Sequence, residues 1–232
     1  MGLTVDPAAL LLGQPGAGLL LDLDGTLVDS EPVHVAAYRE YFCGRGWRVQ
    51  DEVIGEFTGR RAPEVFATLP GPWSGEDPFA LTEGVLDALR CTTVRPVPVA
   101  GAARLIAACA QAALPVAVVT SARREWVKVV LELLGVADPV VLMVTAEDCS
   151  QGKPDPEPFL RGAGLLGLRP ADLVAAEDST AGIVSARGAG IGHVVGVTTS
   201  RPADVLLAAG ANATAADLVG LGRVVDTLDR TR

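Results

Sequence analysis

Five short runs of apolar residues alternate along the chain with longer stretches of helical character. Short apolar runs bounded by turn-forming residues are typical of buried strands. The runs are Leu19–Leu21, Val116–Val119, Val140–Val144, Leu173–Ala176 and Val194–Val197. The helix-like stretches are Val99–Ala113, Ala122–Leu134, Pro156–Leu166, Ser179–Ala189 and Ala203–Ala209. This alternation predicts an α/β fold, in which helical crossovers join parallel strands into a Rossmann-like, doubly wound sheet.

The segment from about residue 32 to 97 interrupts this alternation. It contains four helix-like stretches and no convincing strand: Pro32–Phe42, Gln50–Phe57, Ala62–Leu69 and Phe79–Leu89. We therefore expect a small all-α cap domain at residues 32–97, inserted after the first strand of an α/β core domain that comprises residues 1–31 and 98–232. Ligands of open α/β sheets bind beyond the carboxyl ends of the strands. The cap is expected to open for substrate and to close over the site.

The formal net charge of −9 argues against nucleic acid and anionic membranes as partners. No stretch approaches the ~20 apolar residues of a membrane span. The four cysteines are scattered, as is typical of a reduced cytosolic protein. We expect a cytoplasmic protein that is a monomer or a weak dimer. The chain has only two lysines, Lys128 and Lys153, so a lysine within a motif is more readily interpreted as functional.

Two carboxylates stand where the first strand ends, in the string Leu21-Asp22-Leu23-Asp24-Gly25-Thr26. In an extended segment, Asp22 and Asp24 share a face because successive side chains alternate. Clustered carboxylates repel one another, so they need a cation or a shared proton. Hard oxygen ligands favour Mg²⁺, and the string therefore predicts a magnesium site at the end of this strand.

The segment Asp22–Thr26 resembles the D-x-D-G-T signature of the haloacid dehalogenase superfamily, which consists mostly of phosphatases. Three further segments are similar to the other signature elements of that superfamily and follow in the same order: Val118–Ser121, Gly152–Pro156 and Ala176–Gly182. The resemblance extends from Leu19 to Gly190. It points to the branch that has a helical cap and includes sugar phosphatases and β-phosphoglucomutases.

The resemblance implies that Asp22 attacks phosphorus and becomes an aspartyl-phosphate. Asp24 would first protonate the leaving oxygen and then deprotonate the attacking water. Asp22, the backbone carbonyl of Asp24 and the carboxylate of Asp178 would hold Mg²⁺. Glu177 would be a fourth acidic group at the metal, bound directly or through water.

Three more residues are implied in phosphate binding. The hydroxyl of Thr120 would donate to a phosphoryl oxygen, with the backbone N–H of Ser121 nearby. Thr120 can also cap the helix that follows it. Lys153 would pair with both the phosphoryl group and Asp22.

The resemblance implies a small phosphorylated metabolite as the substrate, such as a sugar phosphate or polyol phosphate, and two enzymatic activities remain open. Ser30–His34 resembles a segment that β-phosphoglucomutases share with many sugar phosphatases, which makes His34 a candidate for substrate binding. The cap turn of the mutases reads Gly-Val-Ser-Arg, whereas this chain has Gly59-Arg60-Arg61-Ala62. That difference favours a phosphatase over a phosphomutase. Arg60 and Arg61 are candidate substrate contacts because an arginine fork suits a hydroxylated or anionic ligand.

A third hypothesis is a non-catalytic binding or regulatory protein on the same fold. All the catalytic side-chain types of the superfamily are present, which disfavours that hypothesis.

Overall fold

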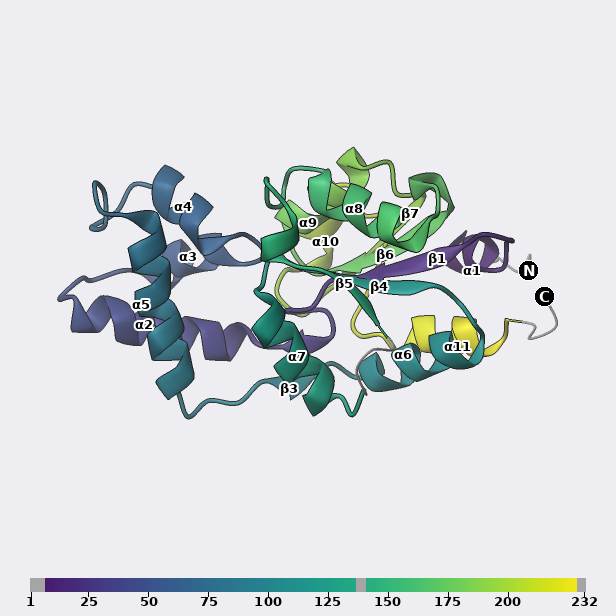
Figure 1. The fold of residues 1–232 in the computed structure, drawn as a ribbon, viewed down its shortest axis with the longest axis horizontal. Helices are drawn as coiled ribbons and strands as arrows, with labels where there is room; N and C mark the ends of the chain where they lie inside the picture. The colour runs from purple at the N-terminus through teal and green to yellow at the C-terminus, as the bar shows by residue number, and fades with distance from the viewer. Residues whose placement is uncertain (1–6, 137–140, 229–232) are drawn as a thin grey trace.

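A computed structural model describes residues 7–136 and 141–228 of the chain. Six strands form one sheet in the order β5-β4-β1-β6-β7-β8, and every neighbouring pair is parallel (Figure 1). The strands are β1 (Gly18–Leu21), β4 (Val116–Val119), β5 (Leu142–Val144), β6 (Leu173–Glu177), β7 (His193–Val197) and β8 (Ala213–Ala215). The predicted Rossmann-like, doubly wound sheet is confirmed. Val140, the first residue of one predicted strand, lies outside the described residues.

Strand β1 is the point at which the chain changes direction across the sheet. From β1 the chain continues to β4 and β5 on one side, and then to β6, β7 and β8 on the other. The loops that follow β1, β4 and β6 therefore diverge at the same edge of the sheet. Such a switch point forms a crevice in open α/β folds.

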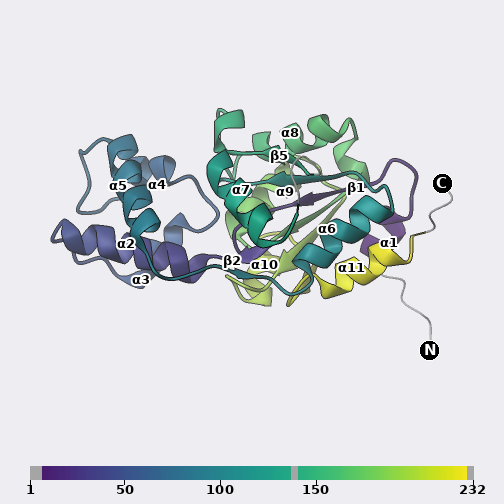
Figure 2. The ribbon, with the colours of Figure 1, turned by 60° about the horizontal axis from the view of Figure 1, so that its bottom comes forward.

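Helices cover both faces of the sheet (Figure 2). Leu19 and Leu21 pack on one face with residues of α1, α6, α7 and α11, whereas Leu20 packs on the other with residues of α8, α9 and α10. This is the alternation expected of a strand that is buried on both faces. The helices are α1 (Pro7–Leu12), α6 (Ala102–Gln111), α7 (Arg124–Leu133), α8 (Glu157–Leu166), α9 (Thr180–Gly188), α10 (Ala203–Ala208) and α11 (Val219–Asp226), with 3₁₀ turns η2 (Ala146–Asp148) and η3 (Pro170–Asp172).

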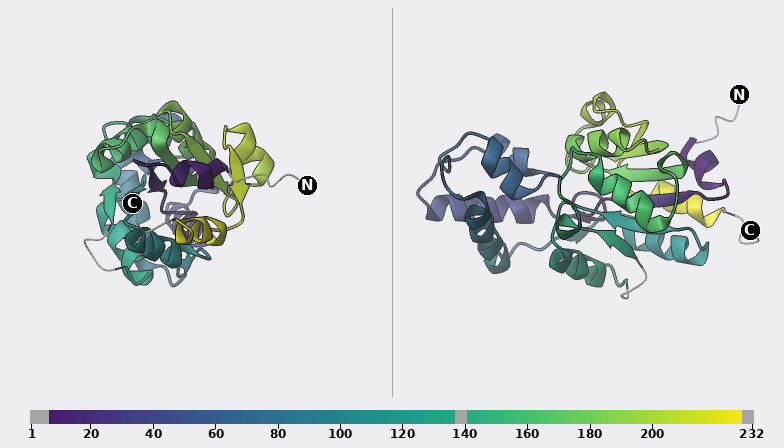
Figure 3. Two further views of the ribbon diagram at one scale, coloured as in Figure 1. Left: turned by 90° about the vertical axis from the view of Figure 1, so that its right-hand side faces the viewer. Right: turned by 45° about the horizontal axis from the view of Figure 1, so that its top comes forward.

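Between β2 (Val28–Asp29) and β3 (Val97–Pro98) the chain forms a helical group, which comprises α2 (Glu31–Gly44), α3 (Asp51–Ile54), the 3₁₀ turn η1 (Gly55–Phe57), α4 (Ala62–Thr68) and α5 (Pro78–Cys91). The right-hand view of Figure 3 shows this group beyond one end of the sheet. It packs around its own aromatic cluster, in which Trp73 is 1% exposed and stacks on Phe42. The indole N–H of Trp73 donates to the Leu69 carbonyl at 2.9 Å, so this residue belongs to the interior of the group. The division into a cap domain at residues 32–97 and a core domain stays a proposal.

Several short elements were not predicted. β2 and β3 form an antiparallel two-residue ladder where the chain enters and leaves the helical group, so the expectation of no strand up to residue 97 is wrong at Val97. A ladder this short has no periodicity that a sequence pattern could reveal. Helices α1 and α11 and strand β8 were also missed, and the Ala-Thr-Ala of β8 lacks a large apolar residue. Within the described residues, no helix is long and apolar enough to cross a membrane.

Candidate active site

Asp22 lies directly after β1, at the carboxyl edge of the sheet. Its N–H donates to the Ala176 carbonyl at 3.0 Å, which extends the contact between β1 and β6 by one residue. The chain then turns at Gly25, whose φ is 80°. A Cβ at Gly25 would lie 1.9 Å from Oδ2 of Asp178, so only glycine permits this approach of the two loops. Gly25 thereby allows the loop that carries Asp22 to lie against Asp178.

Lys153 is fully buried beside these carboxylates. Its Nζ lies 2.5 Å from Oδ1 of Asp22 and 2.7 Å from Oε2 of Glu177. The other oxygen of Glu177 accepts hydrogen bonds from the N–H and the hydroxyl of Ser179, at 3.1 and 2.7 Å. Because a buried ammonium is stable only when it is paired, the two carboxylates fix the position of Lys153.

The carboxylates of Asp22, Glu177 and Asp178 form a buried acidic cluster, with one oxygen of each within 4.8 Å of the others. Neither oxygen of Asp178 has a well-formed hydrogen bond to the described residues, although the nearby Ser200 hydroxyl and the charge of Lys153 favour its ionised form. Burial raises the pKa of Asp178 well above its usual value, and the charges of Glu177 and Asp22 add to the rise. Burial and Glu177 also raise the pKa of Asp22 to about 8, although Lys153 opposes the change. One lysine does not balance three carboxylates, so this donor set fits a divalent cation.

Asp24, two residues after Asp22 in the loop that follows β1, belongs to a second network of hydrogen bonds. Its Oδ1 accepts hydrogen bonds from the Ser30 hydroxyl at 2.6 Å and the Trp126 indole at 2.8 Å, and lies 3.2 Å from Nε2 of His34. Burial opposes the ionisation of Asp24, but the hydrogen bonds from His34, Ser30 and Trp126 outweigh it and lower the pKa of this carboxyl. All of these contacts are to the same oxygen. Asp24 is thus oriented by two residues at the start of α2 and one residue of α7.

Thr120 and Ser121 follow β4, at the same edge of the sheet. The Thr120 hydroxyl accepts a hydrogen bond from the N–H of Ala122 at 3.0 Å. This contact resembles the helix cap that was the alternative interpretation of Thr120. That bond leaves the hydroxyl proton free to be donated to a ligand. The hydroxyl of Ser121 donates to the Gly59 carbonyl of the helical group at 3.0 Å.

A cavity of about 370 Å³ lies over this edge, between the sheet and the helical group. Asp22, Asp24 and Thr120 line its floor, and Val35, Ile54, Phe57 and Leu86 are among the apolar residues that line it from the helical group. His34, Arg60, Arg61 and Ser121 also line it. The Nε of Arg60 is buried and has no hydrogen-bond partner within the described part of the chain. The guanidinium of Arg61, by contrast, donates to the Ala146 and Cys149 carbonyls at 2.7 and 2.8 Å.

The structure therefore brings the predicted site residues together at one edge of the sheet and on the facing side of the helical group. Lys153, Glu177 and Asp178 are buried beside the cavity, and the other predicted residues line it. Sequence reasoning missed Ser30 and Trp126 as partners of Asp24. Ser30 stands at the start of α2, where a serine is normally interpreted as a helix cap. Trp126 lies 102 residues from Asp24 along the chain, so only the folded structure shows their contact.

Comparisons with known proteins agree with the predicted resemblance. Residues 19–197 match the model of a family described as haloacid dehalogenase-like hydrolase. The validoxylamine A 7'-phosphate phosphatase of Streptomyces hygroscopicus subsp. limoneus is 36% identical over 188 residues, which cover 81% of this chain and 88% of that protein. Hexitol phosphatase A of Escherichia coli (strain K12) is 35% identical over 190 residues, covering 81% and 84%.

Among solved structures, a hydrolase from Pseudomonas syringae superposes with a TM-score of 0.80 and 25% identity, covering 90% of this chain and 97% of that one. The Streptomyces and Escherichia coli relatives are both named phosphatases, which supports the predicted enzyme class, a phosphoric monoester hydrolase.

Proposed function

Because the chain belongs to the haloacid dehalogenase-like hydrolase family, we propose that it is a magnesium-dependent phosphatase that hydrolyses a sugar phosphate or polyol phosphate through an aspartyl-phosphate on Asp22. The observation that carries the proposal is the pairing of the buried Lys153 with Asp22 beside the buried carboxylate of Asp178. The site thereby combines a nucleophile (Asp22), a fixed positive charge (Lys153) and oxygen ligands for a metal (Asp178). These are the components that phosphoryl transfer requires.

In the first step, a carboxylate oxygen of Asp22 bonds to phosphorus as the bond from phosphorus to the ester oxygen breaks. Asp24 gives its proton to the departing oxygen, which leaves as an alcohol. In the second step, Asp24 accepts a proton from water as the water oxygen attacks phosphorus. The bond between phosphorus and Asp22 then breaks, and inorganic phosphate is released.

The contacts of Asp24 support its role in both proton transfers. Its Oδ1 is occupied by Ser30, Trp126 and His34, whereas Oδ2 accepts no hydrogen bond from the described residues. The donors lower the pKa of Asp24 in the free protein. A phosphoryl dianion bound nearby raises the pKa of a carboxyl. We infer that Asp24 takes up its proton together with the substrate.

The buried acidic cluster fits Mg²⁺, since its oxygens are hard ligands and Asp178 has no well-formed hydrogen bond to the described residues. The carboxylates of Asp22 and Asp178 and the backbone carbonyl of Asp24 would hold the ion, and a bound Mg²⁺ supplies positive charge that offsets the charge of the phosphoryl group. Both oxygens of Glu177 already accept hydrogen bonds from Lys153 and Ser179. We therefore assign Glu177 to the orientation of Lys153, with any contact to the ion through water.

Of the remaining candidate residues, some would bind the phosphoryl group and others the leaving group of the substrate. Thr120, the backbone N–H of Ser121 and Lys153 would bind the phosphoryl group. His34 and Arg60 line the cavity beside it, and the unpartnered Nε of Arg60 can donate to a hydroxyl of the leaving group. The names of the Streptomyces and Escherichia coli relatives support a polyhydroxylated leaving group.

The experiment is a measurement of phosphate release with Mg²⁺ from a panel of hexitol phosphates, sugar phosphates, nucleotides and phosphoglycolate. We expect release from one class of sugar or polyol phosphates, and none after chelation of divalent metal. A parallel assay follows the conversion of sugar 1-phosphates into 6-phosphates. Conversion with little free phosphate would contradict the proposed hydrolysis and indicate a phosphomutase.

A further inference from the structure

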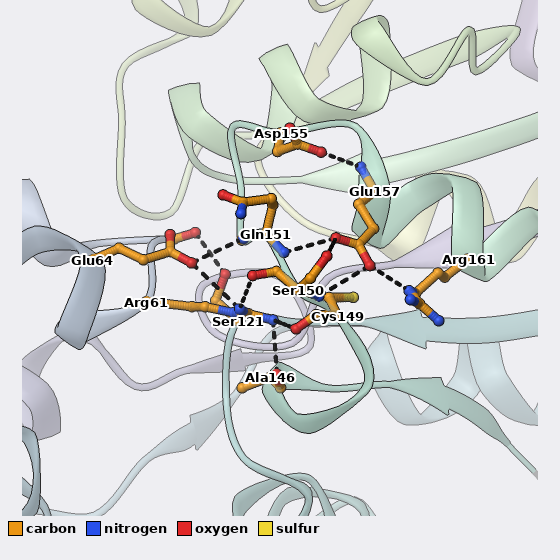
Figure 4. Close-up of polar contacts among 12 residues, drawn as sticks. Arg61, Glu64, Ser121, Ala146, Cys149, Ser150, Gln151, Asp155, Glu157 and Arg161 are labelled. Atoms are coloured by element: carbon orange, nitrogen blue, oxygen red, sulfur yellow. Dashed lines mark hydrogen bonds and ion pairs between the residues drawn. The ribbon is translucent and has the colours of Figure 1, made fainter. Parts of the chain in front are cut away.

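The guanidinium of Arg61 reaches from the start of α4 to the loop that precedes Lys153 (Figure 4). It donates to the carbonyls of Ala146 and Cys149 at 2.7 and 2.8 Å, and lies 3.5 Å from that of Ser150. The Arg61 side chain is only 13% exposed. Its contacts are therefore concentrated on the main chain of residues 146–150.

Glu64, one turn further along the same segment, binds the next part of the loop. Its Oε1 accepts the N–H of Gly152 at 3.0 Å and lies 3.3 Å from Nη1 of Arg61. A Cβ at Gly152 would lie 2.8 Å from both Cδ of Arg61 and Oε2 of Glu64. Glycine at position 152 thus permits the close contact between the loop and this arginine–glutamate pair.

The same loop is also anchored from the sheet side. Glu157 of α8 accepts hydrogen bonds from the N–H and hydroxyl of Ser150 and from the N–H of Gln151, at distances of 2.6 to 3.0 Å. Arg61 and Glu64 hold the loop from the opposite side (Figure 4). Lys153 follows Gly152 directly in the sequence. Both sets of contacts thus converge on the loop that leads to Lys153.

We propose that Arg61 and Glu64 are positioning residues for Lys153, and that they form a latch between the helical group and the loop of residues 146–152. Through this latch, the phosphoryl-binding site is complete only while the helical group lies against the sheet. The inference rests on the proposed phosphatase function. It gives Arg61 a task other than the substrate contact expected from the sequence, because its donors already face main-chain carbonyls.

The other contacts across this boundary are less suited to the same task. Arg123 pairs with Glu83, but both side chains are more than 40% exposed, and exposed pairs contribute little. Ser121 donates a single hydrogen bond to the Gly59 carbonyl. Arg201 donates a single hydrogen bond to the Gly55 carbonyl at 2.8 Å. Among the contacts of the described residues, only those of Arg61 and Glu64 combine several hydrogen bonds with a contact to Gly152, the residue before Lys153.

The test uses orthovanadate, a phosphate analogue that has no leaving group, together with backbone hydrogen exchange of residues 146–152. We expect Arg61→Ala and Glu64→Ala each to weaken inhibition by vanadate about 10-fold and to accelerate exchange in this loop. Glu64→Gln keeps an acceptor for the Gly152 N–H and should restore most of both properties. In the double variant, vanadate inhibition and loop exchange should differ little from those of the more impaired single variant, because both side chains act through one loop.

Arg45→Ala is the matched control, because Arg45 pairs with Glu76 inside the helical group and away from this loop. It should leave vanadate inhibition and loop exchange unchanged, and thermal melts would check that each variant is folded. If Arg61→Ala unfolds, Arg61→Gln takes its place in both measurements.

Unchanged vanadate inhibition in Arg61→Ala, with a lower kcat/KM for the phosphorylated substrate, would overturn the latch and identify Arg61 as a ligand of the leaving group. If the wild-type protein neither binds vanadate nor releases phosphate, the proposed function fails. Loop exchange then still decides whether the latch exists: faster exchange in both alanine variants supports it, and unchanged exchange overturns it.

Discussion

The indole Nε1 of Trp126, on α7, donates a hydrogen bond of 2.8 Å to Oδ1 of Asp24, in the loop after β1. The same indole packs edge-on against His34, with ring centroids 5.8 Å apart. Trp126 therefore orients both the proposed acid/base and its imidazole neighbour. Neither the spacing nor the composition of the sequence indicates this contact.

Trp126→Phe should lower kcat about 10-fold for alkyl phosphates, since a hydrogen bond to a charged group contributes about 1.5–3 kcal/mol and Ser30 and His34 still hold Asp24. The loss should be smaller for p-nitrophenyl phosphate, whose leaving group needs little protonation. Steady-state kinetics on both substrates checks this. Equal losses for the two would show that Trp126 does not act through Asp24.

Asp24→Asn should reduce turnover by about 10²–10⁴-fold, the usual contribution of a general acid/base. Mg²⁺ affinity should change little, because the proposed metal ligand at this position is the backbone carbonyl. Calorimetric titration with Mg²⁺ beside a turnover assay separates the two effects. Normal turnover would refute the assignment of Asp24 as the acid/base.

Lys153→Ala should weaken vanadate inhibition and destabilise the fold by about 3 kcal/mol, because it leaves Asp22 and Glu177 without their buried partner. The exposed Lys128, the only other lysine, provides the control, and Lys128→Ala should change neither property. Denaturant unfolding and vanadate titration are the measurements. A variant with unaltered vanadate affinity would remove Lys153 from the phosphoryl site.

Gly25→Ala should abolish Mg²⁺-dependent activity, because the added Cβ overlaps the carboxylate of Asp178. Gly167→Ala is the comparison: its φ of 68° is equally left-handed, but no heavy atom lies within 4 Å of the added Cβ. That variant should lose about 1 kcal/mol of stability through backbone strain alone and keep its activity. Retention of full activity by Gly25→Ala would mean that the two loops do not meet as described.

The features that the sequence predicts well are those encoded by local patterns. The apolar runs around Leu20 and Val118 mark buried strands, and Asp22 and Lys153 stand in short motifs. The features that it misses depend on contacts between distant segments. The α4 residue Glu64 meets Gly152 only because the helical group lies against the sheet. Trp126 meets Asp24 because β4, which precedes α7, lies beside β1 in the sheet.

The positions of the two neighbouring arginines illustrate the same limit. In the sequence, Arg60 and Arg61 are equivalent candidates for substrate binding. In the structure, Arg61 faces main-chain carbonyls, whereas the Nε of Arg60 is without a partner in the described regions. Both arginines follow Gly59, whose φ is 73°, and a residue pattern does not specify the direction in which the side chains after such a turn point.

The most direct test of the central claim compares phosphate release by the wild-type protein and by Asp22→Asn, with hexitol phosphates as substrates and Mg²⁺ present. Asn cannot act as the nucleophile but preserves the shape of the side chain, and circular dichroism would confirm that the variant is folded. The account predicts phosphate release by the wild type and none by the variant. Release at the same rate by a folded Asp22→Asn would contradict an aspartyl-phosphate on this residue.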